Sequence, residues 1–216
     1  MHYLSNLFRA LDLTSLGDMV LRLLSVLLCL TVHELCHGLA AYALGDPTAK
    51  QQHRLSLNPL RHIDWFGFAM LALAGFGWAK PVPVNPNYFK KPKQGMALTA
   101  LAGPLSNMVL ALVLLLLTKL LWKGSMTGSA QVLTFLLRTA LLSIGLGIFN
   151  LLPIPPLDGS KVLFAVLPDR QYDILMRYER IGMLALMALV LLGVGGSFLT
   201  TTRYWVFDLF CRIVGL

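Results

Sequence analysis

The stretch that decides the fold is DMVLRLLSVLLCLTVHELCHGLAAYAL, residues 18–44. It is apolar over most of its length, and ~20 such residues suffice for a helix to cross the hydrocarbon core of a bilayer. Its second half nevertheless carries His33, Glu34 and His37. Such side chains are costly inside a membrane unless something binds them. We therefore expect a membrane-spanning helix that carries a functional site.

The whole chain has the composition of a membrane protein. Of its 216 residues, 56% are hydrophobic and 13% are charged, whereas a soluble domain carries about 25% charged residues. This excludes an ordinary soluble globular protein. The net charge of +8 comes from cations in the short connections between apolar stretches, where Lys and Arg set orientation and contact anionic headgroups. We expect the lipid bilayer as a partner and no nucleic acid.

Five apolar stretches follow one another along the chain. Four of them are long enough to cross a membrane, namely residues 18–44, 98–118, 132–157 and 181–199. The remaining stretch, residues 65–79, is shorter and lies between two basic loops, so we expect a short or re-entrant segment there. The sequence thus predicts an all-α polytopic membrane protein with four main transmembrane helices, forming a single integral membrane domain over residues 1–216.

The distribution of Lys and Arg predicts how this domain is oriented. If residues 65–79 re-enter, eleven basic residues lie on one side of the membrane and five on the other; if they cross, the split is nine and seven. Because cytoplasmic loops carry the excess of Lys and Arg, the uneven split favours the re-entrant arrangement. We expect a cell-membrane protein with its N-terminus outside and its functional site nearer the cytoplasmic face.

The residues His33-Glu34-Leu35-Cys36-His37 form an HExxH motif. On a helix, positions i and i+4 share a face, so both imidazoles can bind the same metal ion, with Glu34 beside them for proton transfer. A bound metal ion also offsets the cost of these polar groups in the membrane. The thiolate of Cys36 is an alternative ligand, although a small core residue is the more common role of such a cysteine.

Catalytic zinc takes three protein ligands and keeps one open position, so a third ligand must come from elsewhere in the chain. Asp158 ends an apolar, helix-breaking frame, NLLPIPPLDG (residues 150–159), at the end of the 132–157 stretch. Asp64 is the next candidate, but its position is more typical of a helix cap. The polar segment AGPLSN (residues 102–107) opens the 98–118 stretch on the same side. We expect these insertions to meet at one level of the membrane.

Together these motifs resemble the site-2 proteases, which are intramembrane zinc metalloproteases, and in particular a small prokaryotic branch without a PDZ domain. The resemblance covers nearly the whole chain and depends on HELCHG (33–38), AGPLSN (102–107) and NLLPIPPLDG (150–159). It implies that one Zn²⁺ per chain is bound by His33, His37 and Asp158. It also implies that Glu34 is the catalytic acid, and that Asn150 and Asn107 position a transmembrane protein substrate.

The leading functional hypothesis is therefore an intramembrane zinc metalloendopeptidase that cuts within or near transmembrane segments. A metal-binding membrane transporter is a second class, but transport requires several polar sites along a route. A noncatalytic membrane scaffold is a third, against which the complete ligand set argues. A substrate helix must unwind before attack, and we expect it to pair as an added strand with the proline-rich stretch before Asp158 or with residues 65–79; alternatively, the prolines only shape a kink.

Overall fold

The computed structural model describes residues 16–67, 78–123, 130–168 and 179–216. Helices make up most of this part of the chain, which contains no β-strand and only an isolated bridge between Ile63 and Ala79. The elements are, in order, α2 (Leu16–Ala43), α3 (Thr48–Gln51), η1 (Pro59–Arg61), η2 (Pro86–Tyr88), α5 (Pro92–Lys123), α6 (Ala130–Asn150), α7 (Asp158–Ala165), α9 (Glu179–Leu191) and α10 (Gly196–Val214). The predicted all-α class is confirmed.

Three of these helices are long and apolar enough to cross a membrane, over Gly17–Ala43, Pro92–Trp122 and Ala130–Asn150. Many of their large apolar side chains point away from the protein. On α5, those exposed include Leu105, Val109, Leu116 and Leu120. An outward-facing apolar surface of this extent suits contact with lipid. These features are those of a multi-pass membrane protein.

The first two predicted spans agree with the structure. α2 matches residues 18–44, and α5 contains residues 98–118 and extends beyond both ends. The predicted span 132–157 is wrong at its end, because α6 stops at Asn150. The reason lies in Pro153, Pro155 and Pro156, since proline has no N–H for the helical ladder and its ring clashes with the preceding turn.

The predicted span 181–199 is not one continuous helix. α9 ends at Leu191 and α10 begins at Gly196, and between them Gly193 and Gly195 both have positive φ. A right-handed helix requires negative φ, so the chain turns here although the residues on both sides are apolar. The four-helix arrangement is therefore not confirmed. The predicted re-entrant segment lies mostly outside the described residues, in 68–77.

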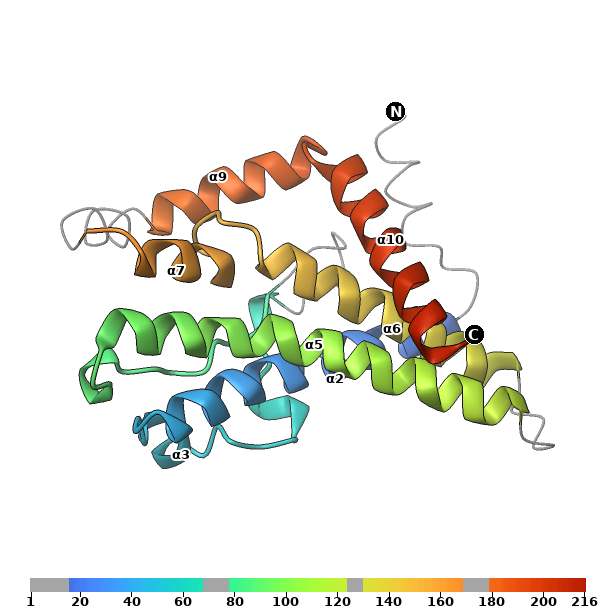
Figure 1. The fold of residues 1–216 in the computed structure, drawn as a ribbon, viewed down its shortest axis with the longest axis horizontal. Coiled ribbons are helices and arrows are strands. Elements are labelled where there is room, and N and C mark those ends of the chain that lie inside the picture. The colour runs from blue at the N-terminus through green and yellow to red at the C-terminus, as the bar shows by residue number, and fades with distance from the viewer. Residues whose placement is uncertain (1–15, 68–77, 124–129, 169–178) are drawn as a thin grey trace.

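α5 forms the centre of the bundle (Figure 1). It packs against α2, α6, α7 and α10, while α2 also packs against α6. Where α5 meets α6, Leu115 and Ile144 are completely buried, and α10 adds Val214 to the same apolar cluster. Because α2 and α7 both pack against this central helix, side chains that are far apart in the sequence come together beside it.

Hydrogen bonds made by polar side chains connect α6 to its neighbours. The hydroxyls of Ser25 on α2 and Thr139 on α6 are 2.7 Å apart, and the thiol of Cys29 donates to the Thr139 carbonyl at 3.8 Å. Ser143 on α6 donates to the carbonyl of Asn107 on α5 at 2.8 Å. In a lipid environment such contacts satisfy polar groups that hydrocarbon leaves unpaired. They help to fix α2 and α5 relative to each other.

Candidate metal centre

His33 and His37 lie one turn apart on α2, and both are buried. Their Nε2 atoms are 3.0 Å apart, and their rings meet edge to face with centroids 4.5 Å apart. α2 is continuous through this region, so the spacing of four residues places both side chains on one face. The structure therefore brings the two histidines of the motif together.

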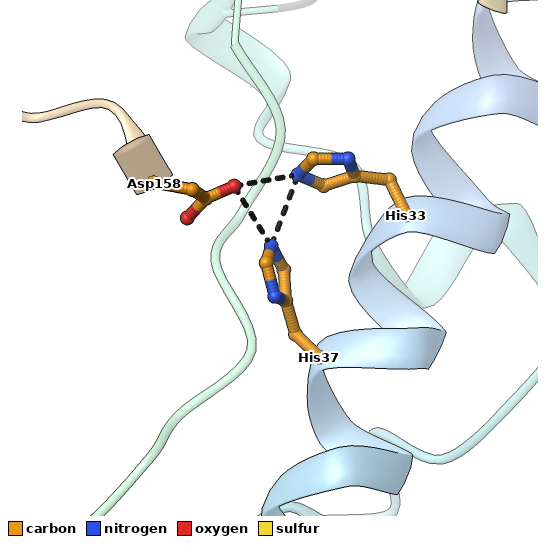
Figure 2. Close-up of side chains that lie close together, drawn as sticks. All are labelled: His33, His37 and Asp158. Carbon is orange, nitrogen blue, oxygen red and sulfur yellow. Dashed lines mark hydrogen bonds and ion pairs between the residues drawn. The ribbon is translucent and has the colours of Figure 1, made fainter. Parts of the chain in front are cut away.

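Asp158, the first residue of α7, completes this group from the other side (Figure 2). Its Oδ2 atom lies 3.1 Å from Nε2 of His33 and 3.1 Å from Nε2 of His37. As a carboxylate, Asp158 supplies a negatively charged oxygen of the kind that binds metal ions.

Gly159 allows the chain to turn sharply beside Asp158. A Cβ atom at this position would lie 2.1 Å from the carbonyl oxygen of Leu151 and 2.6 Å from that of Leu152, so any side chain would push the loop between α6 and α7 away. The hydroxyl of Ser160 then donates to the carbonyl of Leu157 at 2.6 Å and closes the first turn of α7. The sequence LDGS therefore fixes the direction in which Asp158 points.

The three ligand atoms form a triangle of nearly the size that zinc requires. Its edges are 3.0, 3.1 and 3.1 Å, whereas tetrahedral Zn²⁺ with bonds of about 2.0–2.2 Å separates neighbouring ligand atoms by roughly 3.3–3.6 Å. Two imidazoles and one carboxylate are also the ligands of many catalytic zinc sites with an open fourth position. Across the described ranges, these residues alone form a metal-ligating group of this kind. They fit a single zinc ion.

α5 contacts both histidines from the side opposite α2. Nδ1 of His37 donates to the carbonyl of Thr99 at 2.7 Å, and in the neutral imidazole Nε2 then carries no proton. The side-chain amide nitrogen of Asn107, a completely buried residue, lies 3.0 Å from Nδ1 of His33. Between them, a Cβ atom on Gly103 would lie 2.4 Å from Nε2 of His37. α5 can therefore pass this close to the site only because residue 103 is glycine.

Glu34 is buried next to the histidines and has a partner of its own. Its Oε2 atom accepts a hydrogen bond from the backbone N–H of Val82 at 2.8 Å. This fixes one carboxylate oxygen of Glu34 against the extended segment of residues 78–85. No residue pattern predicts this contact, because its donor is a main-chain group.

Two charged side chains attach the 78–85 segment to the region that follows α2. Arg54 donates to the carbonyl of Lys80 at 2.6 Å, and the Asp46 carboxylate accepts from the N–H of Asn85 at 2.7 Å. Arg54 is itself buried, which lowers the pKa of its guanidinium, while the nearby charge of Glu34 acts in the opposite direction. The segment beside Glu34 is therefore anchored at both ends.

Other residues weighed from the sequence lie outside this triangle. The amide of Asn150 donates to the carbonyl of Leu146 at 2.9 Å, and it makes no hydrogen bond to His33, His37 or Asp158. Asp64 accepts from the N–H of Gly67 at 2.8 Å, as expected of a helix cap. Cys36 has a free, partly buried thiol and does not belong to the metal-ligating group.

Sequence reasoning missed one charged neighbour of the site. The Nζ atom of Lys161 lies 3.9 Å from Oδ1 of Asp158, the carboxylate oxygen that faces away from the histidines. The two residues are three apart at the start of α7, and residues at this spacing are neighbours on a helix surface. The three-residue separation of Asp158 and Lys161 in LDGSK was therefore the sequence feature from which this contact could have been predicted.

Comparisons with known proteins agree with this geometry. A family model described as Peptidase family M50 matches residues 120–193, a range that includes Asp158. "Putative zinc metalloprotease YwhC" of Bacillus subtilis is 37% identical over 179 residues, which cover 80% of each chain. "Putative zinc metalloprotease Rip2" is 29% identical in Mycolicibacterium smegmatis, over 91% of this chain and 76% of the relative, and 30% identical in Mycobacterium tuberculosis, over 89% and 75%. No solved structure matches the chain significantly. The chain belongs to peptidase family M50, the site-2 protease family.

Proposed function

We propose that residues 1–216 act as one intramembrane zinc metalloendopeptidase domain, which hydrolyses peptide bonds within or near transmembrane segments of other proteins. The observation that carries this proposal is the triangle of His33, His37 and Asp158, with Glu34 directly beside it. The names of the relatives support both the zinc ion and the peptidase activity.

The depth of the site supports a substrate inside the membrane. α2 ends at Ala43, and at ~1.5 Å per residue His37 and His33 lie roughly 9 and 15 Å before that end. A peptide bond must therefore come below the membrane surface to reach them. The excess of Lys and Arg in the loops after α2 supports a site nearer the cytoplasmic face of the cell membrane.

The side chains divide the chemistry among them. His33, His37 and Asp158 would hold a zinc ion, which would supply a Lewis acid for the scissile carbonyl and lower the pKa of water toward about 7. Glu34 takes the proton from the attacking water and passes it to the leaving nitrogen. Because Val82 already engages Oε2 of Glu34, the other oxygen, Oε1, is the one that handles the proton.

The substrate must expose a peptide bond that a helix would hide in its own hydrogen bonds. The irregular loop of residues 151–157 and the extended segment of residues 78–85 both lie beside the site and are not part of any α-helix. An unwound substrate would pair with one of them as an added strand. Asn150, the last residue of α6, would then position the substrate from the start of the 151–157 loop.

Replacing Glu34 by Gln tests this function. The variant keeps the size of the side chain and the acceptor for the Val82 amide, but it cannot carry the proton. We expect zinc content equal to that of the wild type, and cleavage of a membrane-embedded peptide reduced by at least ~100-fold. Zinc is measured by elemental analysis of the purified protein, and cleavage in reconstituted vesicles.

The same variant separates the alternatives. If the protein were a metal transporter or a noncatalytic scaffold, the Glu34→Gln change would leave its zinc transport or zinc content the same. The wild type would then cleave no peptide, so the change could not reduce cleavage. Wild-type protein that binds zinc and moves it across the vesicle membrane without cutting peptide would overturn the peptidase proposal.

A further inference from the structure

We infer that Asn107 is a positioning residue of the metal centre: its side-chain oxygen accepts a hydrogen bond from Nδ1 of His33 and so keeps Nε2 of His33 free for zinc. This inference rests on the proposed function, and it names the device that holds one of the ligands. In it, Asn107 acts through His33 and does not touch the substrate.

The first observation is the burial of Asn107. The residue is 0% exposed, and the hydroxyl of Ser143 donates to its main-chain carbonyl at 2.8 Å. A Cβ atom on Gly147 of α6 would lie 3.5 Å from Cβ of Asn107, so α6 packs directly against this residue. A substrate has no access to a side chain enclosed in this way, whereas His33 is in direct contact with it.

The second observation concerns the two ends of the Asn107 amide. The amide nitrogen lies 3.0 Å from Nδ1 of His33, and Oδ1 is buried without a hydrogen-bond partner. Zinc needs the lone pair of Nε2, so the proton of a neutral His33 must sit on Nδ1, and the atom that faces Nδ1 must then be an acceptor. A half turn of the amide, which hardly changes its shape, brings the unpartnered Oδ1 to this place.

The third observation is the spacing of the residues on α5. Thr99, Gly103 and Asn107 are four residues apart, so they form one stripe along the helix. The Thr99 carbonyl accepts from Nδ1 of His37, and Gly103 leaves room for the imidazoles. Asn107 completes the stripe as the acceptor for His33. α5 thus provides a hydrogen-bond acceptor for Nδ1 of each histidine. For His37 the acceptor is a backbone oxygen, and for His33 it is a side-chain oxygen.

Zinc affinity of the full-length protein, measured in detergent by competition with a chelator, tests this inference. Asn107→Leu removes the acceptor and should weaken zinc binding by about 10–100-fold. Asn107→Asp offers only acceptor oxygens and should bind zinc at least as tightly as the wild type. Thr118→Val is the matched control, because Thr118 is a buried residue of α5 whose hydroxyl bonds only to Leu114 of its own helix. Its affinity should not change.

Two outcomes would overturn the inference. If Asn107→Leu binds zinc within about twofold of the wild type, Asn107 does not support His33. If Asn107→Asp weakens zinc binding by about 10–100-fold, the partner that His33 requires is a hydrogen-bond donor and not an acceptor. The comparison of Asn107→Asp with the wild type is decisive even where Asn107→Leu fails to fold. Zinc retained by His33→Ala is a separate result, which would refute the proposed centre itself.

Discussion

Asp158 brings to the centre the negative charge that two neutral imidazoles lack. Replacing it with alanine removes one of three ligands, so we expect zinc to fall from about one per chain to a small fraction of that. Metal analysis of the purified variant measures this. Asp64→Ala is the matched control, because Asp64 only caps a turn at Gly67, and it should keep its zinc. Undiminished zinc in the Asp158→Ala protein would remove Asp158 from the site.

Residue spacing predicted much of this group but not the contacts around it. His33 and His37 meet because a continuous helix fixes their separation, and Asp158 was found because prolines isolate it from α6. The carbonyl of Thr99 and the N–H of Val82 could not be found in this way, since every residue carries the same backbone groups. The roles of Glu34 and Asn150 remain predictions, and the burial of Asn107 favours the support of His33 inferred above over the predicted contact with a substrate.

At the scale of elements, we predict that the 78–85 segment contributes to catalysis by holding Glu34 in place. Val82→Pro removes the N–H that holds Oε2 of Glu34, whereas Val82→Ala keeps it. We expect the proline variant to lose about tenfold or more in kcat, because Glu34 is then less well placed for proton transfer, with its zinc content unchanged. The alanine variant should retain most of the activity. Equal kcat values for the two proteins would show that this contact does not matter for catalysis.

The boundaries of the elements were the weakest part of the sequence prediction. Hydropathy averages over a window, so it joined α6 to the apolar loop 151–157 and α9 to the start of α10. Both breaks depend on backbone geometry rather than on polarity. Prolines end the first helix, and glycines with positive φ separate the second pair. The length of an apolar stretch therefore overestimates the length of its helix.

For the whole molecule, a zinc ion would join α2 to α7 and so stabilise the folded bundle. A ligand that binds only the native state stabilises it by about 2.7 kcal/mol when present at 100 times its Kd. We therefore expect a chelator to lower the midpoint of thermal unfolding of the detergent-purified protein, and added zinc to restore it. The Asp158→Ala variant is the control and should show no such response. The same midpoint with and without chelator in the wild type would contradict this prediction.

The class of the molecule was predictable where its exact topology was not. Low charge and long apolar stretches indicated a helical membrane protein, and α2, α5 and α6 have the lengths and apolarity that membrane spans require. How the helices pack around α5 could not be read from hydropathy. Packing depends on features such as the absence of a side chain at Gly103, and on hydrogen bonds between helices such as that of Ser25 with Thr139.

Because the metal-ligating group joins α2 to α7, it can form only at a certain stage of protein synthesis. The ribosome releases His33 and His37 well before Asp158, which follows His33 by 125 residues. A nascent or prematurely terminated chain can therefore insert its first helices into the bilayer while its metal-ligating group is still incomplete. Any capacity to cut neighbouring proteins would arise only after Asp158 has emerged and α7 has packed against α5.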